Sequence, residues 1–132
     1  AGSDPVVELH GTIWDTVCLD CGALTPTLVT LERSEPDPRC EQCGGILKTA
    51  TISFGQSLDR EVLDAAITAA RTADLLVSVG TSLQVMPAAA LADMAKRLVV
   101  VNAQPTPYDA QADAVVRDPI GEVLPRVVAS LT

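Results

Sequence analysis

Two short cysteine pairs decide how the first third of this chain folds: Cys18-Leu19-Asp20-Cys21 and Cys40-Glu41-Gln42-Cys43. Eighteen residues separate Cys21 from Cys40, and this spacing is typical of a zinc site with four thiolate ligands. Zinc prefers four ligands at the corners of a tetrahedron, with sulfur at about 2.3 Å. A two-residue gap lets one tight turn present two sulfurs to one ion, so two such turns close the shell. The sequence therefore predicts one structural Zn²⁺ ion held by Cys18, Cys21, Cys40 and Cys43.

Glycines follow both pairs, Gly22 after the first and Gly44-Gly45 after the second, and supply backbone freedom that such turns use. Two disulfides are an alternative interpretation of the cysteines, and a rubredoxin-like iron site would use the same spacing. A closed four-cysteine shell leaves no position for water or substrate, so it stabilises the fold and performs no chemistry. Function must therefore come from the residues that flank the cysteines.

Composition and charge limit the classes of protein. The chain has 132 residues, 48% of them apolar, and 9 basic against 17 acidic side chains give a net charge of −8. This length suits one domain with a small inserted module, and the acidic charge argues against a nucleic-acid partner. No apolar run approaches the roughly 20 residues of a membrane helix, and no N-terminal segment indicates export. With zinc-ligating thiols, these features predict a reducing cytoplasmic location and no membrane partner.

The second half of the chain predicts strands that alternate with helices. Apolar runs that predict strands occupy residues 75–79, 98–101 and 114–116, and helices are expected at 59–70, 87–97 and behind Pro119. Asp59 is the expected N-cap of the first of these helices. Such alternation favours parallel pairing, and unbroken apolar runs favour strands that are buried on both faces.

The expected fold class is therefore α/β: a partial doubly wound parallel sheet, which is Rossmann-like, with a small four-cysteine zinc-ribbon module. A strand at 6–9 leads to a His-Gly pair in segment 1–14. The zinc module occupies 15–50, a strand at 50–54 leads out of it, and segment 51–132 carries the sheet. Ligands of such sheets bind at the carboxyl ends of the strands.

Two of these strand ends are small and polar: Gly80-Thr81-Ser82 and Asn102-Ala103-Gln104. Both could present amides and hydroxyls to a ribose or a phosphate, although either could be an ordinary turn from strand to helix. No Gly-x-Gly-x-x-Gly fingerprint of dinucleotide binding is present.

His10 is the only histidine of the chain. An imidazole exchanges protons near neutral pH, so His10 is the candidate general base. The alternative is a surface or core histidine without a chemical role. Its place before Gly11 and beside the zinc module favours the chemical role.

Taken in order, these segments resemble the sirtuin family, and the resemblance covers nearly the whole chain. Besides the two cysteine pairs, it rests on Glu8-Leu9-His10-Gly11, Gly44-Gly45, Phe54-Gly55, Gly80-Thr81-Ser82-Leu83, Val85-Met86-Pro87, Asn102 and Gly121-Glu122-Val123-Leu124-Pro125. The resemblance implies an NAD-dependent protein lysine deacylase that transfers the acyl group to ADP-ribose, with NAD as co-substrate. Segment 51–132 would then be the C-terminal part of an NAD-binding domain.

The resemblance also implies a role for individual residues. His10 corresponds to the family's general base on a ribose hydroxyl. The stretch that pairs with an acylated-lysine peptide by β-augmentation corresponds to Ile52, Ser53, Phe54 and Gly55. The cofactor-binding positions correspond to Gly80, Thr81, Ser82, Asn102, Ala103, Gln104 and Ile120.

The chain departs from the family pattern in two ways. Ser53 and Gln56 flank Phe54-Gly55 where the family often has an aromatic residue and glutamate, which bears on the choice of acyl chain. The family's N-terminal half, with a Gly-Ala-Gly loop and a Thr-Gln-Asn-x-Asp segment, does not occur. We therefore expect an incomplete core that needs this half in cis or in trans, has little activity alone, and self-associates through its uncovered sheet.

Two other functions remain open at this point. One is a non-catalytic zinc-ribbon interaction module, for which His10 is structural. The other is a domain that senses NAD or ADP-ribose without turnover.

Overall fold

The computed structural model describes residues 4–131, and the chain divides into two compact units, Ala1–Val62 and Leu63–Thr132. Residues 1–3 and 132, at the ends of the expected segments 1–14 and 51–132, lie outside the described residues. The boundaries of those segments stay predictions.

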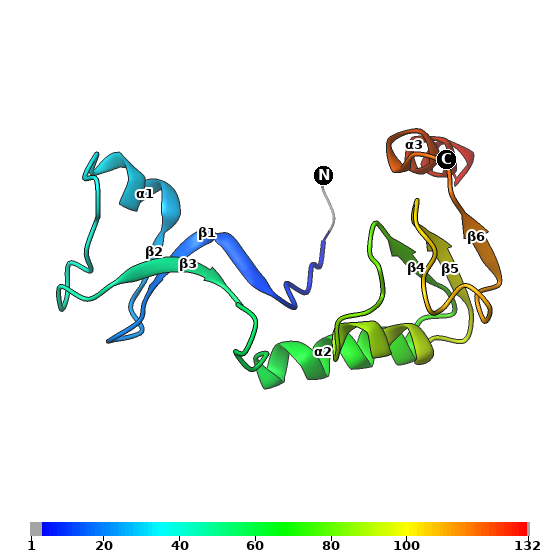
Figure 1. The fold of residues 1–132 in the computed structure, drawn as a ribbon, viewed down its shortest axis with the longest axis horizontal. Helices are drawn as coiled ribbons and strands as arrows, with labels where there is room; N and C mark the ends of the chain where they lie inside the picture. Colours follow the sequence, from blue (N-terminus) through cyan, green and yellow to red (C-terminus); the bar gives the residue numbers. More distant parts are fainter. Residues whose placement is uncertain (1–3, 132) are drawn as a thin grey trace. The chain divides into compact units, whose positions relative to one another are not determined.

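The first unit is built on a three-stranded antiparallel sheet in the order β2-β1-β3 (Figure 1). The strands are β1 (Gly11–Cys18), β2 (Leu24–Pro26) and β3 (Leu47–Thr51), and the helix α1 (Thr27–Glu32) follows β2 directly. A buried hydrogen bond of 2.9 Å between the hydroxyls of Thr16 and Thr30 ties α1 to β1. Cys18 pairs with Leu47 in the sheet, so both cysteine pairs lie at the end where β1 finishes and β3 starts.

Of the two strands predicted at 6–9 and 50–54, the first does not form and the second has other bounds. Residues 6–9 form no strand, because the chain turns at Leu9 and His10, where the Gly11 N–H donates to the Glu8 carbonyl at 2.9 Å. The strand begins only at Gly11, after this turn. The strand expected at 50–54 is β3, which lies earlier because it pairs along β1, and Phe54 lies in a turn.

The second unit holds a parallel sheet in the order β4-β5-β6, which confirms the pairing that the apolar runs predicted. Its strands are β4 (Leu76–Val79), β5 (Leu98–Val101) and β6 (Ala114–Val116). The register aligns Val79, Val101 and Val116, the last residues of the three strands. The carboxyl ends of all three strands therefore form one edge.

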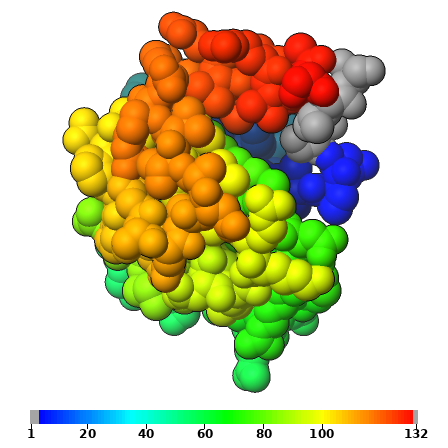
Figure 2. All heavy atoms as spheres, turned by 90° about the vertical axis from the view of Figure 1, so that its right-hand side faces the viewer, coloured from blue at the N-terminus to red at the C-terminus, as the bar shows by residue number. Residues whose placement is uncertain are grey.

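Three helices accompany the sheet: α2 (Arg60–Thr72), the 3₁₀ helix η1 (Ala88–Asp93) and α3 (Ile120–Leu131). Asp59 caps α2 as predicted, because its Oδ1 accepts the Val62 N–H at 3.0 Å. In Figure 2 the red atoms of α3 lie against the orange atoms of the segment around β6. None of the helices in the described part of the chain combines the length and apolarity needed to cross a bilayer.

The helix expected at 87–97 is shorter than predicted and is of the 3₁₀ type. The Leu76 N–H donates to the Arg97 carbonyl at 2.9 Å, so the backbone must already be extended at Arg97 to enter β5. The Met94 N–H donates to the Leu91 carbonyl at 3.2 Å and closes the last turn of η1. Sheet pairing therefore ends the helix early.

The core of the second unit gathers around β5. Val100 is fully buried and packs with Leu83, Ala92 and Leu98. Val77 of β4 keeps 47% of its surface exposed, because β4 pairs only with β5 within residues 4–131. Ala114 and Val115 of β6 are exposed as well. Burial on both faces was therefore predicted well for the central strand and wrongly for β4 and β6.

Candidate metal centre and cofactor-binding edge

Each cysteine pair closes a tight turn of the same design. In the first turn the Gly22 N–H donates to the Cys18 carbonyl at 3.0 Å, and the Cys18 N–H donates to the Ala23 carbonyl at 2.9 Å. The second turn repeats this pattern, with Gly44 donating to the Cys40 carbonyl at 2.8 Å. Gly22 and Gly44 have φ of 73° and 75°, a conformation that glycine adopts without a steric penalty. The expected use of glycine in both turns is confirmed.

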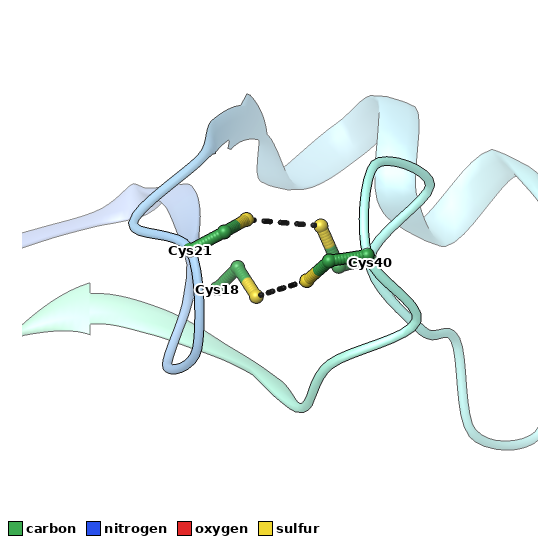
Figure 3. A group of neighbouring side chains, drawn as sticks. Cys18, Cys21 and Cys40 are labelled. Atoms are coloured by element: carbon green, nitrogen blue, oxygen red, sulfur yellow. Dashed lines mark hydrogen bonds between the residues drawn. The ribbon is translucent and has the colours of Figure 1, made fainter.

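The two turns bring four sulfur atoms together (Figure 3). All four lie within 4.8 Å of one another and could hold a metal ion, and they belong to Cys18, Cys21, Cys40 and Cys43. The Sγ atoms of Cys18 and Cys43 are 3.5 Å apart, and those of Cys21 and Cys40 are 3.7 Å apart. The thiols are free, and these separations far exceed the roughly 2.05 Å of a disulfide. A tetrahedral zinc ion would place its sulfurs about 3.8 Å apart, so the residues fit one zinc ion.

The four thiols lie so close together that their ionised forms repel one another unless a cation is bound. Donation from the Cys21 N–H lowers the pKa of Cys18 to about 7. The Gly45 N–H lowers the pKa of Cys43, but the Cys21 and Cys18 thiols outweigh it and raise that pKa to about 12. The thiol of Cys18 therefore loses its proton more readily than that of Cys43, because neighbouring thiolates repel each other. A divalent metal binds thiolates and removes this repulsion.

His10 lies in the turn before β1, and its side chain is exposed. Gly11 has φ of 70°, and a Cβ placed on it would lie 2.1 Å from the carbonyl oxygen of Ala50. Only glycine fits there, because β1 passes against the backbone of β3 without room for a side chain. The glycine of the His-Gly pair thus fixes where the backbone of His10 lies.

The predicted substrate segment begins beside His10. The Ile52 N–H donates to the His10 carbonyl at 2.8 Å. Beyond Ile52 the chain is a turn rather than an extended strand, because Gln56 donates its N–H to the Ser53 carbonyl at 3.0 Å and accepts the Ser53 N–H on Oε1 at 2.8 Å. Phe54, within this turn, is 95% exposed. The histidine and the segment 52–55 are therefore neighbours within one unit.

The predicted cofactor-binding residues lie at the carboxyl edge of the parallel sheet. The Gly80 N–H donates to the Val101 carbonyl at 2.9 Å, and the Asn102 N–H donates to the Val116 carbonyl at 3.1 Å. Gly80 and Asn102 thus continue the hydrogen bonding of the sheet by one residue beyond the ends of β4 and β5. A Cβ placed on Gly80 would lie 3.1 Å from Cδ1 of Ile120, the first residue of α3. Gly80, Asn102 and Ile120 are brought together at this edge.

The loops that leave this edge are held by their own hydrogen bonds. Thr81 Oγ1 accepts the Leu83 N–H at 3.2 Å, and Leu83 is buried. Asn102 Nδ2 donates to the Gln104 carbonyl at 2.8 Å. The exposed residues of these loops include Gly80, Thr81, Ser82, Ala103 and Gln104. Hydroxyl and amide groups therefore stand where ligands of parallel sheets bind.

Sequence reasoning missed one residue of this edge, Arg117. Its Nη1 donates to the carbonyls of Asn102 and Gln104, at 2.7 and 3.0 Å, and its Nη2 pairs with the carboxylate of Asp109. Its position could have indicated this role, because Arg117 is a cationic residue directly after the apolar run at 114–116.

Comparison with known proteins identifies the family. Residues 1–87 match the model of the Sir2 family. The chain belongs to the Sir2 family. This finding confirms the resemblance to the sirtuins and the expected α/β fold.

Curated relatives of the chain are longer than the chain itself. NAD-dependent protein deacetylase 2 of Streptomyces coelicolor is 53% identical over 133 residues, which cover 96% of this chain and 55% of that protein. The NAD-dependent protein deacetylase of Clostridium acetobutylicum is 38% identical over 130 residues, which cover 97% and 53%. The chain thus spans about half the length of the curated relatives it matches.

Solved structures share the fold over the same extent. A structure described as "Sir2-p53 peptide-NAD+" has a TM-score of 0.87 at 30% identity, covering 98% of this chain and 56% of that one. "Structure of Sir2Tm bound to a propionylated peptide" also has a TM-score of 0.87 at 30% identity, covering 98% and 57%.

Proposed function

We propose that this chain is the C-terminal half of the catalytic core of an NAD-dependent protein lysine deacylase, which transfers the acyl group to ADP-ribose. The observation that carries the proposal is the 2.8 Å hydrogen bond from the Ile52 N–H to the His10 carbonyl, because it joins the candidate base to the candidate substrate segment. The names of the Streptomyces and Clostridium relatives support the reaction. The neighbours solved with NAD and with a propionylated peptide support the two substrates.

In this proposal His10 is the general base. Its exposed imidazole accepts the proton of a ribose hydroxyl of NAD, which an imidazole does well near neutral pH. The acyl oxygen of the lysine attacks C1′ of the nicotinamide ribose, and nicotinamide leaves. The deprotonated ribose hydroxyl then attacks the acyl carbon, water adds, and the bond to the lysine nitrogen breaks, so the free lysine amine is released and the acyl group ends on ADP-ribose.

The segment Ile52–Gly55 binds the backbone of the acylated peptide. Such pairing adds a strand to exposed backbone and uses main-chain hydrogen bonds for affinity. The Ser53 N–H is held by Gln56 Oε1, so the turn must open at Ser53 before this donor can bind a peptide. Gln56 therefore influences how readily the peptide is accepted.

The carboxyl edge of the parallel sheet binds the ADP-ribose part of NAD. Asn102 and its loop hold the adenosine ribose, and the apolar side chain of Ile120 covers the adenine. The remaining contacts to ribose and phosphate come from Gly80, Thr81, Ser82, Ala103 and Gln104.

Zinc holds the two cysteine turns, and through them the end of the antiparallel sheet. It stabilises the first unit and takes no part in the reaction, because four cysteines complete its shell.

The partner that completes the core is the other half of the protein, in cis or in trans, since the chain spans about half of its relatives. Leu75, just before β4, and Val77, within β4, are both exposed apolar side chains. Such an apolar edge supports contact with the other half, or self-association when that half is missing. No nucleic-acid or membrane partner belongs to the proposal, and the free thiols support a reducing cytoplasmic location.

The test joins this chain to the part of the Streptomyces relative that it does not span. Nicotinamide release is measured with NAD and an acetyl-lysine peptide. We expect the chimera to release nicotinamide and the His10→Ala variant to lose about 100-fold or more in kcat, which is the usual contribution of a general base. Glu8→Gln, an exposed residue of the same turn, is the matched control and should leave kcat unchanged.

The outcomes separate the candidate functions. Full activity of His10→Ala would remove the histidine from the mechanism. A folded chimera that binds no NAD would indicate a zinc-ribbon interaction module, and one that binds ADP-ribose without turnover would indicate a sensor. The 132-residue chain alone is expected to release little or no nicotinamide.

A further inference from the structure

Arg117 stands at the carboxyl edge of the sheet and holds the loop that leaves β5. Its Nη1 donates to two carbonyls of this loop, 2.7 Å from that of Asn102 and 3.0 Å from that of Gln104. The guanidinium therefore binds both ends of the first turn of this loop, at Asn102 and at Gln104. Arg117 is separated from these partners by 15 and 13 residues, so the contact is a feature of the folded sheet.

The charge of Arg117 is balanced inside the same network. Its Nη2 pairs with the Asp109 carboxylate, which also accepts the hydroxyl of Thr106 at 2.7 Å and the Thr106 N–H at 3.2 Å. The Thr106 donors and Arg117 hold the pKa of Asp109 below its usual value. Nη1 of the guanidinium is engaged by the two loop carbonyls, and the charge is paired with Asp109, so a phosphate would have to compete with Asp109 for Arg117. This arrangement makes Arg117 a brace for the loop.

This brace determines what Asn102 can offer to a ligand. The side-chain Nδ2 of Asn102 donates to the Gln104 carbonyl at 2.8 Å, the same oxygen that Arg117 holds. One of the two N–H groups of the amide is thereby committed to the loop, which fixes the orientation of the side chain, and the amide oxygen is the group that can accept a hydrogen bond from a ribose hydroxyl.

We propose that Arg117 is a positioning residue for NAD: it holds the Asn102–Gln104 loop in the conformation that presents Asn102 to the adenosine ribose, and it does not itself bind the phosphates. The proposal rests on the proposed function of this edge. We expect lysine to replace Arg117 poorly, because a single ammonium group lacks the planar arrangement of donors that reaches two carbonyls and a carboxylate together.

Steady-state kinetics of the chimera of this chain with the remaining part of the Streptomyces relative test the proposal. Arg117→Gln is expected to raise KM for NAD about tenfold, equivalent to about 1.4 kcal/mol, and to change kcat less than about twofold. Arg117→Lys should recover part of the loss. Arg126→Gln, which removes the same charge from exposed α3, is the control and should keep KM unchanged.

Two competitive inhibitors distinguish a brace from a phosphate ligand. For Arg117→Gln we expect adenosine and ADP-ribose to lose affinity by the same factor, because both carry the adenosine ribose. Loss for ADP-ribose alone would overturn the proposal, since it would place Arg117 on the phosphates. An unchanged KM would also overturn it.

Two further results keep the inference separate from the proposed function and from a folding defect. If the unsubstituted chimera shows no NAD turnover, the proposed function fails and this inference fails with it. If Arg117→Gln does not fold, Arg117→Lys decides, and a KM for NAD equal to that of the parent then refutes the brace.

Discussion

Gly45 gives the sharpest test of how the chain builds its metal centre. A Cβ on Gly45 would lie 2.3 Å from Oδ2 of Asp20 and 2.9 Å from Sγ of Cys18. Both distances are shorter than van der Waals contact, so Gly45→Ala must displace the Cys18 sulfur or move the two cysteine turns apart. The turns are joined by backbone bonds, including Leu19 N–H to the Ile46 carbonyl at 2.9 Å, which limits how far they can separate.

The magnitude follows from these contacts. Overpacking of this kind costs about 1–3 kcal/mol of folding stability, and disturbing the surroundings of a ligand usually costs about 10- to 100-fold in metal affinity. We therefore expect Gly45→Ala to bind zinc at least about tenfold more weakly than the parent. The measurement is competition for zinc with a chromophoric chelator at fixed pH.

Gly44→Ala is the matched control, because nothing lies within 4 Å of a Cβ at that position. Its φ of 75° makes alanine strained, which costs about 1 kcal/mol without touching a sulfur. Zinc affinity should therefore fall more for Gly45→Ala than for Gly44→Ala. Equal affinities for Gly45→Ala and the parent would refute the packing argument.

Three substitutions test the rest of the fold. Ser78→Ala should raise the free energy of unfolding by about 1 kcal/mol, because the Ser78 hydroxyl is buried without a hydrogen-bond partner within the described residues; a loss of similar size in denaturant titration would contradict this. Asp59→Ala should cost about 1 kcal/mol through the lost helix cap, whereas the exposed Asp64→Ala should not. The Leu98 N–H lowers the pKa of Asp113, so ionised Asp113 stabilises the fold above its unfolded pKa, and this stabilisation disappears as pH falls through the folded pKa. Asp113→Asn should therefore flatten the acid side of the stability–pH curve, and an unchanged curve would refute this role.

The features that the sequence predicted correctly are set by local chemistry. The cysteine spacing fixes two turns that each need only a few residues, and Gly22 and Gly44 use the expected backbone freedom, since both have a positive φ. The Asp59 cap depends on one side chain and an N–H three residues later. The three apolar runs predicted the parallel strands correctly, because strands that alternate with helices along a chain generally pair in parallel.

The features that sequence reasoning missed depend on contacts between distant residues. β1 starts at Gly11 because its backbone passes against Ala50, which no local pattern reveals. The early end of η1 follows from the hydrogen bond that the Leu76 N–H donates to the Arg97 carbonyl. Arg117 lies beside its loop because β5 and β6 pair in the sheet, and no local pattern in the sequence reveals this contact.

Product analysis of the chimera tests the central claim most directly. After incubation with NAD and an acetyl-lysine peptide, the account predicts that acetylated ADP-ribose and nicotinamide form in equal amounts, and that both disappear in the His10→Ala variant. Free acetate together with unmodified ADP-ribose, formed at the rate of deacetylation from the first time point, would contradict it.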